Sequence, residues 1–81
     1  MIEQDIRQLL AEATGLPQST VDALPAGTPL FGSPLGLSSR TGVTLLAAVK
    51  QRYGVDVVAE DLTLDSLESI ATLTAYVAAR Q

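Results

Sequence analysis

A long connection, residues 15–38, separates the first helical pattern of this chain from the second and constrains the fold more than any other feature. It contains all four prolines, and Gly27, Gly32 and Gly36 suit turns. Connections of this length are uncommon in compact domains and are usually functional or disordered. Because apolar residues are spread along it, we expect a loop pinned across a helical bundle, with a helical turn at residues 19–24. The expected anchors are Leu16, Val21, Leu24, Leu30, Phe31, Leu35 and Leu37.

Two segments that flank this connection carry apolar residues at helical spacing. In residues 3–14 one apolar stripe is expected to face the core, with polar residues such as Arg7 on the solvent side. In residues 39–53 a stripe through Leu45 and Val49 is expected to face the core, and Gly54 ends the helix.

The C-terminal part is predicted to hold the last helix. Residues 55–58 favour an extended connector, and residues 59–62 a helical turn. The last helix begins between Asp65 and Ser69, with Asp65 and Glu68 as a capping box or Ser69 as the alternative cap. Its expected core residues are Ile70, Leu73, Thr74 and Val77. The sequence thus predicts one all-α domain over residues 1–81, a small bundle of three main helices plus a short fourth.

Composition excludes several function classes. The chain is 47% hydrophobic but only 4% aromatic, so the core must be aliphatic. It has no cysteine and no histidine, which removes thiolate nucleophiles, the commonest general base and most transition-metal ligands. A net charge of −4 argues against nucleic-acid binding. With no membrane-length apolar run and no signal-peptide pattern, we expect a cytoplasmic, monomeric, non-catalytic protein that serves other proteins.

The start of the second predicted helix suits a phosphate group. Backbone N–H groups and the helix dipole favour negative charge at such a position. Ser38 is a plausible N-cap, and Ser39, at the first helical position, is our candidate for a covalent phosphodiester. The reverse assignment, with Ser38 modified and Ser39 as the cap, stays open as the second choice.

Charge is unevenly distributed in this half of the chain. Residues 39–54 hold three bases and no acid, whereas residues 56–68 hold five acids and no base. Ordinary solvated faces explain this pattern, but a basic docking surface on the second helix is the sharper hypothesis. Its candidate partner-binding residues are Arg40, Val43, Leu46, Ala47 and Lys50.

The residues now assembled resemble the acyl and peptidyl carrier proteins over nearly the whole chain. The most specific part is the segment 31–39, Phe-Gly-Ser-Pro-Leu-Gly-Leu-Ser-Ser, followed 14 residues after Ser39 by Tyr53-Gly54-Val55. Family members typically show a Leu-Gly-x-Asp-Ser-Leu box and an aromatic-Gly-Val segment at this distance. Asp65-Ser66-Leu67 spells the box literally, but too few residues follow it for the remaining helices.

This resemblance implies a function without catalysis by the chain itself. A phosphopantetheinyl transferase would use Mg²⁺ to move 4′-phosphopantetheine from coenzyme A onto Ser39. The terminal thiol of that arm would then hold acyl or aminoacyl groups as thioesters for loading and downstream enzymes of polyketide, nonribosomal peptide or related biosynthesis. A chain without cysteine can serve as a thiol carrier in this way.

Two departures from the family box support an alternative. Ser38 stands where the family usually has Asp, and Arg40 stands where it usually has Leu. The alternative is a carrier-fold protein that is poorly or not phosphopantetheinylated and acts as a binding or regulatory subunit. A helical adaptor unrelated to thioester chemistry fits the box less well.

Overall fold

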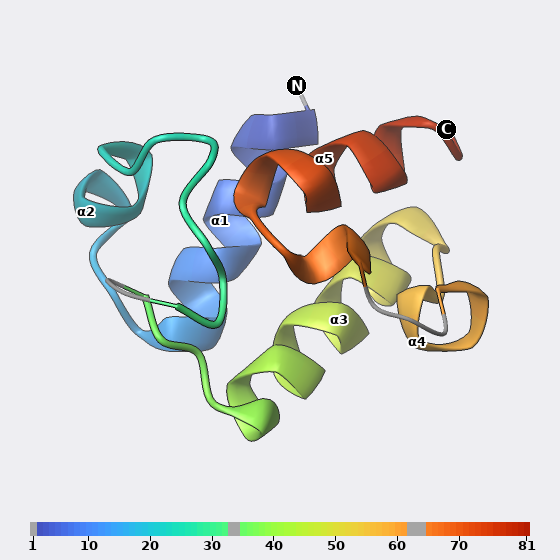
Figure 1. Cartoon of the computed structure of the whole chain (residues 1–81), viewed down its shortest axis with the longest axis horizontal. Coiled ribbons are helices and arrows are strands. Elements are labelled where there is room, and N and C mark those ends of the chain that lie inside the picture. The colour runs from blue at the N-terminus through green and yellow to red at the C-terminus, as the bar shows by residue number, and fades with distance from the viewer. Residues whose placement is uncertain (1, 33–34, 62–64) are drawn as a thin grey trace.

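The computed structural model describes residues 2–32, 35–61 and 65–81, and within them the chain is mostly helical and has no strand (Figure 1). The long helices are α1 (Ile2–Thr14), α3 (Ser39–Tyr53) and α5 (Ile70–Ala78). Three short elements are α2 (Gln18–Asp22), α4 (Val57–Glu60) and the single 3₁₀ turn η1 (Asp65–Leu67). Helix α1 packs against α2, α3 and α5, so it forms the centre of the bundle. The all-α prediction is confirmed.

The core is aliphatic, as the composition requires. It draws side chains from every helix and from the long loop, and it excludes solvent almost completely. Leu45 and Val49 of α3 face it as predicted, as do Ile70, Leu73 and Val77 of α5, whereas Thr74 is only partly buried. The largest fully buried side chains are Ile6, Leu10, Val21, Leu30, Leu45, Val49, Val57, Ile70, Leu73 and Val77.

The long connection is pinned across the bundle by backbone hydrogen bonds to the segment that leads into α5. Leu30 N donates to Glu68 O at 3.3 Å, Ile70 N to Thr28 O at 3.3 Å, and Ala71 N to Ala26 O at 2.8 Å. These bonds run antiparallel around the Pro29–Ser69 pair. They satisfy loop backbone groups that would otherwise be buried without partners. The expected turn near residues 19–24 is present as α2.

Arg7 contradicts the prediction that it faces solvent. Its residue is only 7% exposed, because its Nη1 donates to Val21 O at 2.8 Å and to Leu24 O at 2.7 Å. Its Nε also pairs with Glu3 at 3.3 Å. Burial of a guanidinium is tolerated where it is paired and hydrogen-bonded. Arg7 therefore fastens α1 to the carbonyl groups at the end of α2.

Two predicted boundaries after α3 also need correction. The segment expected to be extended contains α4, which begins at Val57 because Asp56 Oδ1 accepts from Ala59 N and Val57 enters the core. The cap of α5 is Ser69, the alternative, and not Asp65: Ser69 Oγ accepts from Thr72 N, while Thr72 Oγ1 accepts from Ser69 N. Leu62, at the end of the turn expected over 59–62, lies outside the described residues.

Candidate functional site

The start of α3 is fixed from both sides. Gly36 adopts the left-handed region at φ +54°, which glycine permits without strain. Leu37 follows with its side chain buried and its N–H bonded to Leu30 O at 3.0 Å. These two residues bring the chain out of the loop and into α3 in one defined direction.

The two adjacent serines at this point have different environments. Ser38 is the N-cap: its Oγ accepts from Thr41 N at 3.2 Å and lies 3.0 Å from Thr41 Oγ1. Ser39 is exposed on the first turn of α3, and its hydroxyl has no hydrogen-bond partner among the described residues. An accessible hydroxyl at the positive end of a 15-residue helix fits a phosphodiester.

An apolar groove of about 270 Å³ opens beside Ser39. Phe31 forms one wall, and a Cβ built on Gly42 would come within 3.0 Å of its ring. Val58 and Val43 contribute exposed apolar surface, with exposed fractions of 56% and 65%. The residues that line the groove are Phe31, Ser39, Gly42, Val43, Leu46, Val58 and Leu67.

Besides Gly42, the groove contains three residues that sequence reasoning did not assign to the site. Phe31, Val58 and Leu67 come from the long loop, α4 and η1, segments far apart in the sequence. Phe31 was expected to be an anchor, yet it is 48% exposed. Phe31 is the only phenylalanine in the sequence, and it lies in the segment that resembles the family. This was the signal that could have assigned it to the site.

The predicted partner-binding residues lie in four different settings. Val43 and the largely buried Leu46 line the groove, whereas Ala47 is exposed outside it. Lys50 pairs with Asp56 at 3.2 Å, at the far end of α3 from Ser39. Arg40 is exposed next to Ser39 and forms no ion pair with the described residues.

Lys50 pairs with Asp56, the residue that caps α4. The backbone hydrogen bond from Ala59 and the neighbouring Lys50 ammonium lower the pKa of the Asp56 carboxyl. Asp56 thus stays ionised while it caps α4 and neutralises Lys50. The basic character expected of α3 is therefore reduced at this end.

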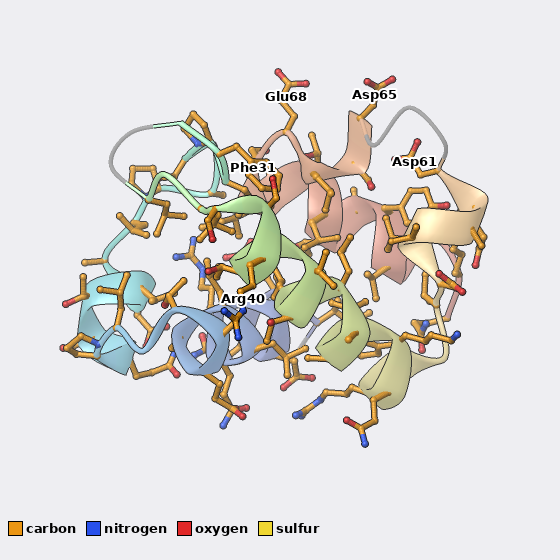
Figure 2. The ribbon with its side chains drawn as sticks, turned by 90° about the horizontal axis from the view of Figure 1, so that it is seen from below. Phe31, Arg40, Asp61, Asp65 and Glu68 are labelled. Carbon is orange, nitrogen blue, oxygen red and sulfur yellow. The ribbon has the colours of Figure 1, made fainter. Side chains whose placement is uncertain are left out.

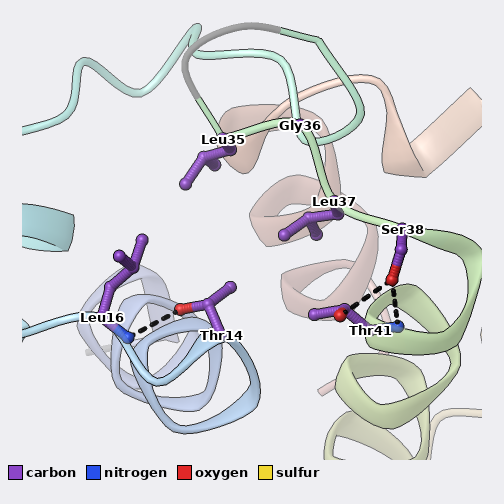
Figure 3. Close-up of a pocket in the computed structure, with 7 residues that line it drawn as sticks. All are labelled: Thr14, Leu16, Leu35, Gly36, Leu37, Ser38 and Thr41. Atoms are coloured by element: carbon purple, nitrogen blue, oxygen red, sulfur yellow. Dashed lines mark hydrogen bonds between the residues drawn. The ribbon is translucent and has the colours of Figure 1, made fainter.

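A second pocket, of about 280 Å³, lies on the side of Ser38 (Figure 3). Its hydroxyl groups are engaged with one another or with nearby backbone: Thr14 Oγ1 accepts from Leu16 N at 3.2 Å, and Ser38 bonds to Thr41. The pocket separates the end of α1 from the segment that leads into α3. Its lining residues are Thr14, Leu16, Leu35, Gly36, Leu37, Ser38 and Thr41.

Ser66, in the literal copy of the family box, lies in a different setting. Its residue is 6% exposed, and its Oγ is buried with no hydrogen-bond partner among the described residues. Its N–H donates to Asp61 at 2.8 Å, and its carbonyl accepts from Thr72 Oγ1 at 2.9 Å. An enzyme would have to displace η1 to reach this hydroxyl.

Two absences hold for the described part of the chain. There, no group of three or more His, Cys, Asp or Glu side chains lies close enough together to hold a metal ion. Nor is any helix in that part both long and apolar enough to cross a membrane.

Comparison with known proteins places the chain in one family. A family model described as "Phosphopantetheine attachment site" matches residues 4–77. Members of this family bear 4′-phosphopantetheine as a covalent group, and carrier domains of this kind are generally non-catalytic partners of phosphopantetheinyl transferases and biosynthetic enzymes. Neither a curated protein nor a solved structure matches the chain. The resemblance seen in the sequence is confirmed.

Proposed function

Because the chain belongs to the family of phosphopantetheine attachment domains, we propose that it is a carrier protein whose arm is attached to Ser39. The observation that supports this assignment is that the two serines at the start of α3 have different environments. Ser38 Oγ is engaged as the helix cap, whereas Ser39 Oγ is exposed and unengaged among the described residues.

Attachment would join Ser39 Oγ to the pantetheine phosphorus of coenzyme A and break the bond from that phosphorus to the rest of the nucleotide. When bound, 4′-phosphopantetheine supplies the thiol that this cysteine-free chain lacks. The amide groups at the start of α3 favour the phosphodiester. The chain supplies no general base of its own, so the transferase performs the chemistry.

The groove beside Ser39 favours an apolar acyl group over an aminoacyl group as cargo. Its lining is almost entirely aliphatic and aromatic, from Phe31, Val43, Leu46, Val58 and Leu67. A charged amino group placed there would lose its hydration without gaining a carboxylate partner from the lining. We therefore propose an acyl carrier for a polyketide-like or related pathway; that it is monomeric and cytoplasmic remains a prediction from the sequence.

The proposal is tested by incubating the chain with coenzyme A, Mg²⁺ and a broad-specificity phosphopantetheinyl transferase. The intact mass should rise by one phosphopantetheine group, and peptide mapping should locate it on Ser39. Ser39→Ala should abolish the gain, whereas Ser38→Ala and Ser66→Ala should retain it as matched controls.

A second function, an unmodified binding or regulatory subunit, is favoured by Ser38 and Arg40, which replace the Asp and Leu usual in the family. No mass gain with the broad-specificity enzyme or with transferases of the protein's own host would favour this function and refute attachment to Ser39.

A further inference from the structure

Three charged side chains without an ion pair in the described part of the chain, Arg40, Asp65 and Glu68, are close in sequence to residues that line the groove. Four of the five basic residues pair with carboxylates, and Arg40 is the exception within the described residues. Among the acids of that same part, Asp65, Glu68 and Glu12 have no ion pair or side-chain hydrogen bond. The four ion pairs are Arg7–Glu3, Lys50–Asp56, Arg52–Asp5 and Arg80–Glu60.

Asp65 and Glu68 lie on one rim of the groove. Both are exposed, and they flank Leu67, whose side chain lines the groove. Figure 2 shows the two carboxylates projecting from the same edge of the molecule, on the side of α3 where Phe31 lies. This rim is therefore negatively charged.

Arg40 lies on the opposite side of α3. Figure 2 shows its side chain toward α1, away from Phe31 and from the two carboxylates. Arg40 follows Ser39 directly, so the attachment serine lies between a positive and a negative rim. Three exposed apolar side chains, Phe31, Val43 and Val58, line the groove beside Ser39.

We propose that this two-signed face docks the phosphopantetheinyl transferase in a single orientation, an inference that rests on the proposed function. An enzyme that reaches Ser39 must cover the surface around it. The fitting partner carries basic side chains opposite Asp65 and Glu68, an acidic side chain opposite Arg40, and an apolar side chain over the groove. Rotated by half a turn, it would place like charges together, which is costly.

This assignment differs from the basic α3 surface expected from the sequence. Lys50 and Arg52 form ion pairs with Asp56 and Asp5. Arg40 is therefore the basic residue of α3 that has no ion pair within the described residues. The unpaired negative charge near the groove comes from η1 and the residue that follows it, not from α3. The partner's charge pattern is accordingly mixed and not purely acidic.

The test measures kcat and KM for loading by whichever transferase adds one phosphopantetheine to the wild-type chain. D65K/E68K should raise KM about tenfold with kcat within about twofold, since rim charges act mainly on association. R40E should raise KM about threefold for the same reason. The neutral pair D65N/E68Q, which is least able to disturb folding, should give an intermediate KM.

Glu12→Lys is the matched control, because Glu12 is exposed, unpaired within the described residues and on α1, which does not line the groove. Its KM should stay within about twofold of wild type. Added NaCl should raise the wild-type KM and raise that of D65K/E68K less.

The outcomes separate the two proposals. Unchanged KM in D65K/E68K and R40E, an equal rise in E12K, or a loss confined to kcat would overturn the docking assignment while loading itself continued. Absence of loading in the wild type would overturn the proposed function instead. Circular dichroism of each variant establishes that the helices are intact before the kinetic comparison.

Discussion

Ser38 and Ser39 are adjacent but contribute differently to the fold. The Ser38 hydroxyl satisfies one of the free amides at the start of α3, whereas the exposed Ser39 hydroxyl satisfies none. Ser38→Ala should therefore lower the free energy of unfolding by about 1 kcal/mol, and Ser39→Ala should change it by less than about 0.5 kcal/mol. Urea denaturation followed by circular dichroism measures both. Equal losses in the two variants would contradict the assignment of Ser38 as the cap.

Gly42 is the residue against which Phe31 packs. A Cβ at this position would lie 3.0 Å from Phe31 Cζ and 3.1 Å from Cε1, closer than carbon atoms normally approach. Because Phe31 is half exposed, its ring can move aside, so we expect Gly42→Ala to fold. Alanine also favours the helix by up to about 1 kcal/mol, which offsets the displaced contact.

NMR checks this prediction through the ring resonances of Phe31, which should shift in Gly42→Ala. Ala47→Ser, on the exposed side of α3 outside the groove, should leave them in place. An unshifted Phe31 in Gly42→Ala would show that the ring does not depend on this contact.

At the scale of elements, α2 depends on Arg7. A five-residue helix is too short to be stable alone, and Arg7 Nη1 supplies hydrogen bonds to Val21 O and Leu24 O. Arg7→Met keeps most of the apolar stem but removes the charged donors. We expect it to lower the free energy of unfolding by about 2–3 kcal/mol, because the Leu24 carbonyl loses the Arg7 donor and the buried Val21 carbonyl keeps only backbone donors such as Leu24 N.

Arg52→Met is the control for this change, since Arg52 is exposed and pairs with Asp5. Its cost should stay below about 1 kcal/mol. Hydrogen exchange in Arg7→Met should accelerate in α2 and not in α5. Similar urea midpoints for the two variants would show that the buried hydrogen bonds of Arg7 add nothing.

Elements that carry their own start and stop signals were predictable from the sequence. Helix α3 has a serine N-cap and Gly54 in the left-handed region at φ +71°, and its predicted range agrees with the structure. The start of α4 was misplaced because its valine-rich beginning locally favours an extended chain, and only burial of Val57 and the Asp56 cap make it helical. Arg7 was misplaced because its partners come from another element.

At the scale of the whole molecule, one cluster joins the beginning of α1 to the end of α3. Asp5 accepts from Tyr53 OH at 2.8 Å and from Arg52 at 3.0 Å. Burial raises the pKa of the Tyr53 hydroxyl above its ordinary value of 10.0, and the hydrogen bond to Asp5 adds to the effect. The folded protein therefore holds this proton more tightly than the unfolded chain does.

The sign of the pH dependence follows from this shift. A raised pKa contributes stability that is fully present below pH 10.0 and is lost as pH rises through the folded-state pKa. The thermal midpoint of the wild type should fall across this range more steeply than that of Tyr53→Phe, which has no proton to lose there. Circular dichroism melts at constant ionic strength provide the comparison. Parallel curves for the two proteins would contradict the prediction.

The site was predictable only where it is local in the sequence. Ser39, Ser38 and Arg40 are consecutive, and their helix-terminal position follows from the caps of α3. The groove could not be predicted, because Phe31, Val58 and Leu67 are brought together by tertiary packing alone. The charge pairs of Lys50 and Arg52 depend on the same packing, so a stretch that is basic in sequence is largely neutralised in space.

The backbone pairing between residues 26–30 and 68–71 also bears on when the groove can exist. It joins segments far apart in the chain, and such contacts form only after a large entropic cost of loop closure has been met. Phe31 immediately follows this paired segment. During synthesis, α1 and α3 emerge from the ribosome before α5, so their helices can form while the outer wall of the groove still lacks its support. We therefore expect a nascent chain that ends before α5 to expose Ser39 before the groove beside it has formed.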